Sequence, residues 1–111
     1  MPLDTRAKIA AERLLLMTEA LSDAVLHDRT DELQGLIASR QAVLDQLGTM
    51  KIDAPAIAIL ESVATAERNL ISLIQRTQGV ATQDMAKLFS GMRQVRAYRN
   101  VPTHSGMQRT G

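Results

Sequence analysis

Carboxylates and histidines are the side chains of this 111-residue chain that could carry metal or acid–base chemistry, since the chain contains no cysteine. A di-metal site in a helical bundle takes glutamates from two helices and a Glu-x-x-His pair from each of two others. Glu12 with Glu19, and Glu61 with Glu67, could supply the glutamates, but no Glu-x-x-His occurs in the sequence. We therefore expect no metal site from these carboxylates.

The histidines and an acidic segment complete the candidates for chemistry. His27 stands at the end of an expected helix, where it complements the helix dipole and has no second ligand at helical spacing. Segment 28–32 lacks the glycine and the longer ligand series of a calcium loop. His104 lies in a stretch without hydrophobic period, so nothing would hold it for catalysis. With no phosphate-binding glycine loop and no activated nucleophile, the sequence predicts no catalytic, cofactor-binding or metal-binding residue and no enzyme activity.

The composition favours helices. Hydrophobic residues make up 45% of the chain, yet there is one Phe, one Tyr and no Trp, so the core must be aliphatic. Good helix formers dominate, and Gly and Pro stand mostly at candidate breaks and near the C-terminus. The sequence predicts one all-α domain over residues 1–99, followed by a disordered tail over residues 100–111, where no hydrophobic period remains.

Two helices are expected in the N-terminal half. The first begins after the capping side chain of Asp4 and ends at about Leu26, because apolar residues recur there at intervals of three and four. The acidic segment 28–32 then predicts a tight turn. The second helix covers 33–47 and ends at Gly48, a suitable left-handed cap. Together they predict an antiparallel helical hairpin.

Two residues of the second helix invite a structural interpretation. Arg40 is a cation on an otherwise apolar line. It either reaches solvent along the apolar surface or pairs with Glu61 or Glu67, which stand at comparable height on the next helix. Gly35 costs about 1 kcal/mol relative to alanine in a helix and suggests a close helix approach.

Residues 53–98 read as one long amphipathic pattern, opened by Asp53 as cap and by Pro55 in the first turn. A continuous helix over this stretch would be roughly 67 Å long, and the hairpin could cover it only to about Leu70 or Leu73. An apolar strip some 30 Å long would remain, which a soluble monomer rarely tolerates. The residues expected to bind a partner on this strip are Leu70, Ile74, Ala81, Met85, Leu88, Phe89, Met92, Val95 and Tyr98.

Three ways of covering the strip stay open: a break near Gly79 that folds the last helix back, a homodimer, or a partner protein. Gly79 can end a helix and Thr82 can cap a new one, but Gly79 can also be tolerated inside a continuous helix. The prediction is therefore a hairpin packed on a long C-terminal helix, with three helices, or four if the chain breaks near Gly79. Met85 and Met92 give the strip an adaptable surface that suits an amphipathic helix.

Charge is distributed unevenly along the chain. The net charge is +1, and no acidic residue follows Asp84. Four cations follow it on the last helical stretch: Lys87, Arg93, Arg96 and Arg99. They form a solvated face that also complements the helix dipole. Without an aromatic platform they favour an acidic protein partner and no nucleic acid.

The location follows from hydropathy. No run approaches the roughly 18 apolar residues that a spanning helix needs, so we expect no membrane insertion. The first apolar run, 14–17, is short and follows mixed charges, so we expect no signal peptide. A soluble, cytoplasmic protein is predicted.

Three segments between residues 10 and 100 follow one another in the order found in a known family. They are the acidic turn followed by Leu33, Leu36, Ile37, Arg40, Val43, Leu44 and Leu47; then Glu67, Leu70, Ile71, Leu73 and Ile74; and finally Arg96, Ala97 and Tyr98. In this order and length the chain resembles bacterial flagellar type III export chaperones of the FliT and FlgN kind.

The resemblance implies a cytoplasmic chaperone without catalytic activity. Such a protein binds the C-terminal helical segment of a filament-cap or hook–filament junction protein, prevents premature assembly and delivers this cargo to the export apparatus. In FliT-like members the last helix can mask the partner surface, which would give the strip from Ile74 to Val95 a switching role. The alternative is a structural coiled-coil protein whose strip serves only self-association.

Overall fold

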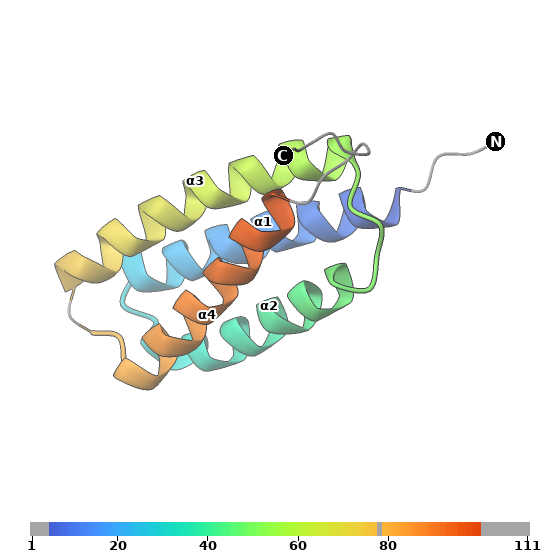
Figure 1. Cartoon of the computed structure of the whole chain (residues 1–111). Helices are drawn as coiled ribbons and strands as arrows, with labels where there is room; N and C mark the ends of the chain where they lie inside the picture. Colours follow the sequence, from blue (N-terminus) through green and yellow to red (C-terminus); the bar gives the residue numbers. More distant parts are fainter. Residues whose placement is uncertain (1–4, 78, 101–111) are drawn as a thin grey trace.

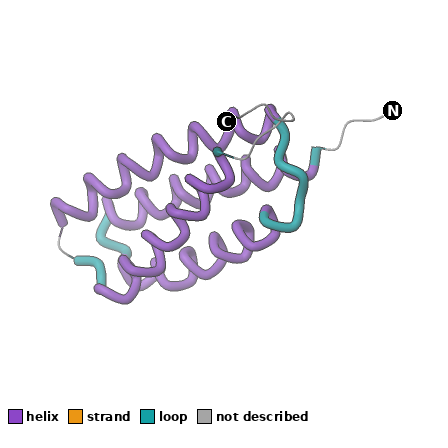
Figure 2. Tube along the Cα trace, in the orientation of Figure 1, coloured by secondary structure: helices purple, strands orange, loops and turns teal. Residues whose placement is uncertain are grey.

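The chain is a bundle of helices. The computed structural model describes residues 5–77 and 79–100, and no strand occurs among them (Figure 2). Its elements are α1 (Arg6–Leu26), the short 3-10 turn η1 (Thr30–Glu32), α2 (Leu33–Leu47), α3 (Ala54–Thr77) and α4 (Thr82–Arg99). The all-α prediction is confirmed. None of these helices is long and apolar enough to cross a membrane.

Each helix packs against two others. α1 lies against α2 and α3, and α4 lies against the same two helices, so that α1 and α4 are diagonally opposite (Figure 1). The expected hairpin is formed by α1 and α2, with η1 in the turn between them. α3 contacts this hairpin through α1, and α4 completes the bundle between α2 and α3.

The long C-terminal pattern is broken. α3 ends at Thr77 and α4 begins at Thr82, so the structure takes the alternative in which the last helix folds back near Gly79 (Figure 1). Gln78 lies outside the described residues. The proposed cap by Thr82 is wrong: Ala81 holds the N-cap position and no side chain caps this end. Asp84 in the first turn of α4 complements the helix dipole instead.

The other helix ends test the local predictions. Asp53 caps α3 as expected, because its Oδ1 accepts a hydrogen bond from the Ala56 amide at 3.2 Å. The left-handed cap predicted at Gly48 is wrong, since its φ is −63°. The positive φ lies at Asp28, in the turn after α1. The cap predicted at Asp4, and the tail beyond Asn100, lie outside the described residues.

Two apolar clusters make up the core, one toward each end of the bundle. The first cluster joins the start of α1 to the end of α2 and the start of α3. The second joins the end of α1 to the start of α2 and the end of α3. Large members of the first are Leu14, Leu44, Leu60, Val63 and Val95, and of the second Leu21, Leu33, Ile37, Leu70 and Leu88. Three buried polar residues stand between these clusters in sequence on their helices: Thr18, Arg40 and Glu67. We call them the polar layer.

Candidate functional site

The nine residues predicted to bind a partner occupy different environments. Because α4 folds back, it buries much of the apolar strip inside the same chain. Leu70, Ile74, Leu88 and Val95 belong to the core. Met85, Phe89, Met92 and Tyr98 are half-buried, and Ala81 is exposed. The deepest part of the strip is therefore accessible to another protein only when α4 moves.

α4 is the helix with the smallest buried surface pattern. Of its 18 residues only Leu88, Gly91 and Val95 are buried. Leu88 belongs to the second cluster and Val95 to the first, and Gly91 stands between them over the polar layer. By contrast, α3 buries seven of its 24 residues. Since apolar burial is the main term that holds a helix in a bundle, α4 is the helix whose detachment costs least.

The polar layer joins three helices by hydrogen bonds. The Thr18 hydroxyl of α1 donates to the Leu14 carbonyl at 2.8 Å and accepts from Arg40 Nε of α2 at 3.1 Å. Arg40 Nη2 donates to Glu67 Oε2 of α3. Arg40 and Glu67 are 2% and 6% exposed. Of the interpretations of Arg40, pairing with Glu67 is confirmed, and both a solvent-facing Arg40 and its pairing with Glu61 are wrong.

Burial sets the protonation of this pair. It raises the pKa of Glu67 to about 6, although the Arg40 guanidinium and, more weakly, Arg99 and Arg96 favour the carboxylate. Burial likewise lowers the pKa of Arg40, partly offset by Glu67. Removing either partner would leave a buried charge without its counter-ion, which costs about 3–5 kcal/mol. The pair thus ties α2 and α3 together at one height.

Gly91 brings the α4 backbone close to this pair. A Cβ atom at Gly91 would lie 2.9 Å from Arg40 Nη1 and 3.0 Å from Leu44 Cδ1. At Gly35 a Cβ atom would meet nothing within 4 Å, so the close approach predicted there is wrong. The sequence offered no sign of Gly91, because its role depends on which helix lies opposite. α4 can dock only where its backbone fits over the polar layer.

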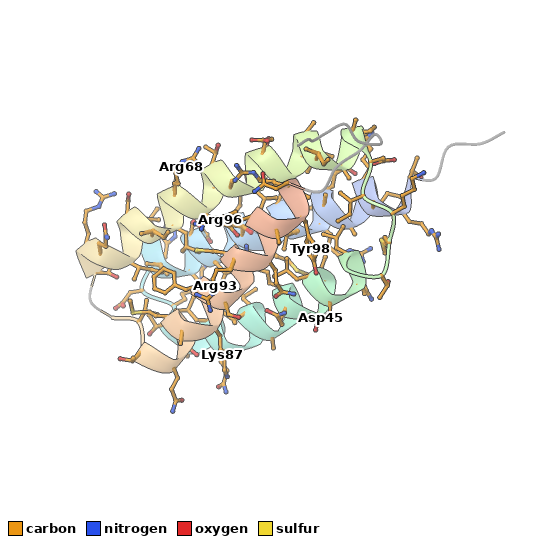
Figure 3. The ribbon with its side chains drawn as sticks, viewed as in Figure 1. Asp45, Arg68, Lys87, Arg93, Arg96 and Tyr98 are labelled. Atoms are coloured by element: carbon orange, nitrogen blue, oxygen red, sulfur yellow. The ribbon has the colours of Figure 1, made fainter. Side chains whose placement is uncertain are left out.

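The side of α4 that faces α2 is closed by polar contacts. The Tyr98 hydroxyl donates to the Leu44 carbonyl at 3.0 Å. Gln41 Nε2 donates to Gln94 Oε1 at 2.6 Å and to Asp45 Oδ1 at 2.9 Å. Figure 3 shows Tyr98 and Asp45 between α4 and α2. These bonds anchor the C-terminal half of α4, whereas no hydrogen bond of this kind joins its first two turns to α2 within the described chain.

Metal chemistry has no support in the side-chain arrangement. Within residues 5–77 and 79–100, no group of three or more histidine, aspartate or glutamate side chains is placed to hold a metal ion. No protein-family model matches this chain, and no curated protein or solved structure matches it significantly. A functional interpretation therefore depends on α4 and on the surfaces that it covers and creates.

Proposed function

We propose that this chain is a chaperone that binds an amphipathic helix of another protein in the place that α4 occupies. The observation that carries this proposal is the docking of α4 by only three buried residues over a core that α1, α2 and α3 build. When α4 leaves, Leu70 and Ile74 of α3 and Leu44 of α2 lose cover. A partner helix regains that burial, at roughly 25 cal/mol for each Å² of apolar surface.

The geometry defines what a competing helix must carry. In α4 the apolar anchors are Leu88 and Val95, with the glycine Gly91 between them. A replacement therefore needs an apolar residue, a glycine or alanine three positions later, and a second apolar residue four positions after that. A larger central side chain would meet Arg40. This spacing places all three residues on one helix face.

The cargo that we propose is the C-terminal helical segment of a secreted flagellar subunit, a filament-cap or hook–filament junction protein. The order of the acidic turn, the leucine-rich second helix and the terminal Arg96-Ala97-Tyr98 supports this choice through the family resemblance. In this role the chain holds the cargo in the cytoplasm, prevents its premature assembly and presents it to the export apparatus. α4 acts as a cover that the cargo helix displaces.

The test compares the wild-type chain with Gly91→Ala and Gly35→Ala. Binding of a fluorescent peptide from the C-terminus of a filament-cap protein is followed by anisotropy. If Gly91→Ala weakens α4 docking by about 2 kcal/mol, the open population and the apparent affinity rise about thirtyfold. Gly35→Ala should bind like wild type. Peptide binding that is absent from all three chains would refute the proposed function.

A second candidate is self-association without secretion cargo. It is favoured by Ile9 and Leu16, which are 49% and 67% exposed and stand seven residues apart on α1. Light scattering on wild type and Leu16→Glu distinguishes the candidates. A dimer that dissociates in Leu16→Glu, together with no peptide binding, supports self-association.

A further inference from the structure

A pocket of about 200 Å³ opens between α3 and α4 on the side of α4 away from α2. Ala64, Ile71 and Met92 give it apolar surface. Three guanidinium groups also line it, those of Arg68, Arg96 and Arg99. The pocket therefore combines a small apolar area with positive charge, a combination suited to an acidic side chain and its apolar neighbour.

The guanidinium groups of this pocket have unused hydrogen-bonding capacity. Arg99 Nε is buried and has no hydrogen-bond partner, and the closest carboxylate oxygen, Glu61 Oε2, is 3.7 Å away. Arg68 donates to the Thr65 hydroxyl at 3.0 Å, and Arg96 makes no hydrogen bond within residues 5–77 and 79–100. A buried donor without an acceptor costs free energy. An incoming carboxylate would supply that acceptor.

The local charge balance favours an anion. Glu67 also lines the pocket, but its carboxylate already binds Arg40. Four guanidinium groups thus face two carboxylates, Glu61 and Glu67, which leaves the site net positive. No acidic residue follows Asp84 in the chain to reduce that charge. Figure 3 shows Arg68, Arg96 and Arg93 on the α3 and α4 side, whereas Asp45 lies on the α2 side.

We infer that this pocket is the docking site for an acidic residue on the helix of the protein partner, with an apolar residue one turn away packing on Ile71 and Met92. The inference rests on the proposed function and names the partner's chemistry. Arginine binds a carboxylate through two parallel hydrogen bonds, which fixes direction as well as position. A nucleic acid is the poorer occupant, because no aromatic side chain lines this pocket for base stacking.

The experiment uses the full-length chain and three synthetic helical probes of about 20 residues. All three carry the Leu-x-x-Ala-x-x-x-Val face, and their flanking positions hold Glu, Gln or Lys. Affinity is measured by anisotropy for wild type, Arg96→Gln, Arg99→Gln and the control Arg93→Gln. Arg93 is exposed on α4 and does not line the pocket, so its substitution removes the same charge elsewhere.

We expect the Glu probe to bind about tenfold more tightly than the Gln probe, and the Lys probe most weakly. Arg96→Gln and Arg99→Gln should each remove most of the tenfold preference, whereas Arg93→Gln should change it less than about twofold. Arg96→Gln is the more decisive variant, because Arg96 makes no internal hydrogen bond whose loss could unsettle α4.

Equal binding of the Glu and Gln probes overturns the docking site but leaves the proposed helix-binding function intact. Failure of all three probes to bind, even to Gly91→Ala, overturns both. A single-stranded oligonucleotide that displaces the Glu probe and requires Arg96 and Arg99 would assign the pocket to nucleic acid and overturn the inference. Equal losses in Arg93→Gln and Arg96→Gln would show a diffuse charge effect and also overturn it.

Discussion

The same substitution at two helical glycines should have opposite effects on stability. Alanine in place of glycine inside a helix adds about 0.5–1 kcal/mol of helix propensity. At Gly35, which is exposed, a Cβ atom has open space, so the whole gain should appear. At Gly91 the added methyl group would lie 2.9 Å from Arg40 Nη1 and 3.0 Å from Leu44 Cδ1, closer than van der Waals contact allows.

The cost at Gly91 follows from what those neighbours can do. Arg40 cannot swing away without losing its bonds to Glu67 and Thr18, and Leu44 is fully buried. Either α4 moves outward or the polar layer is distorted, and overpacking of this kind costs about 1–3 kcal/mol. Against the gain in propensity, Gly91→Ala should be destabilised by up to about 2 kcal/mol. The two variants should thus differ by roughly 1–3 kcal/mol.

Chemical unfolding followed by circular dichroism measures this difference, and hydrogen exchange locates it. The melting temperature of Gly35→Ala should rise by about 4 °C and that of Gly91→Ala should fall. Amides of α4 should exchange faster in Gly91→Ala, while those of α1 and α3 keep most of their protection. Equal stabilisation by both substitutions would refute the close packing of α4 over the polar layer.

Three further substitutions probe the polar layer and the α4 anchor. Arg40→Ala leaves the Glu67 carboxylate buried without its cation and should cost about 3–5 kcal/mol by urea unfolding, whereas a loss under 1 kcal/mol would show that the pair is not buried. Because the folded-state pKa of Glu67 is raised from 4.5 to about 6, its contribution is most favourable below pH 4.5 and is lost as the pH rises through 6. Its part of the free energy of unfolding should fall by about 2 kcal/mol over that window, and this part should vanish in Glu67→Gln. Tyr98→Phe removes the hydrogen bond to the Leu44 carbonyl and should cost about 1 kcal/mol, with faster exchange confined to the end of α4; no change in either quantity would contradict that anchor.

Much of the fold could be predicted from local pattern. The spacing of apolar residues predicted a first helix to about Leu26 and a second over 33–47, and both end where expected. Asp53 caps α3 through a bond to Ala56, three residues away. Such features depend on neighbours within one or two turns, which is the range over which side-chain chemistry and helix periodicity act directly.

The surplus of apolar surface after Leu70 was also visible in the sequence, but its use was not. A break near Gly79, a dimer and a bound partner all cover the same residues, so periodicity alone could not choose among them. The break depends on the free energy of packing α4 against two helices that lie far from it in sequence. Leu88 and Val95 therefore became core residues, whereas Met85, Phe89 and Met92 kept part of their surface exposed.

The sequence by itself determined that this protein is all helical, aliphatic in its core and cationic along its last helix, because composition and helical period are properties of the chain. Only the tertiary structure decided that Arg40 pairs with Glu67 rather than Glu61, and that Gly91 rather than Gly35 is the point of close contact. Both outcomes depend on the relative height and rotation of helices, which are set by the joint packing of all four.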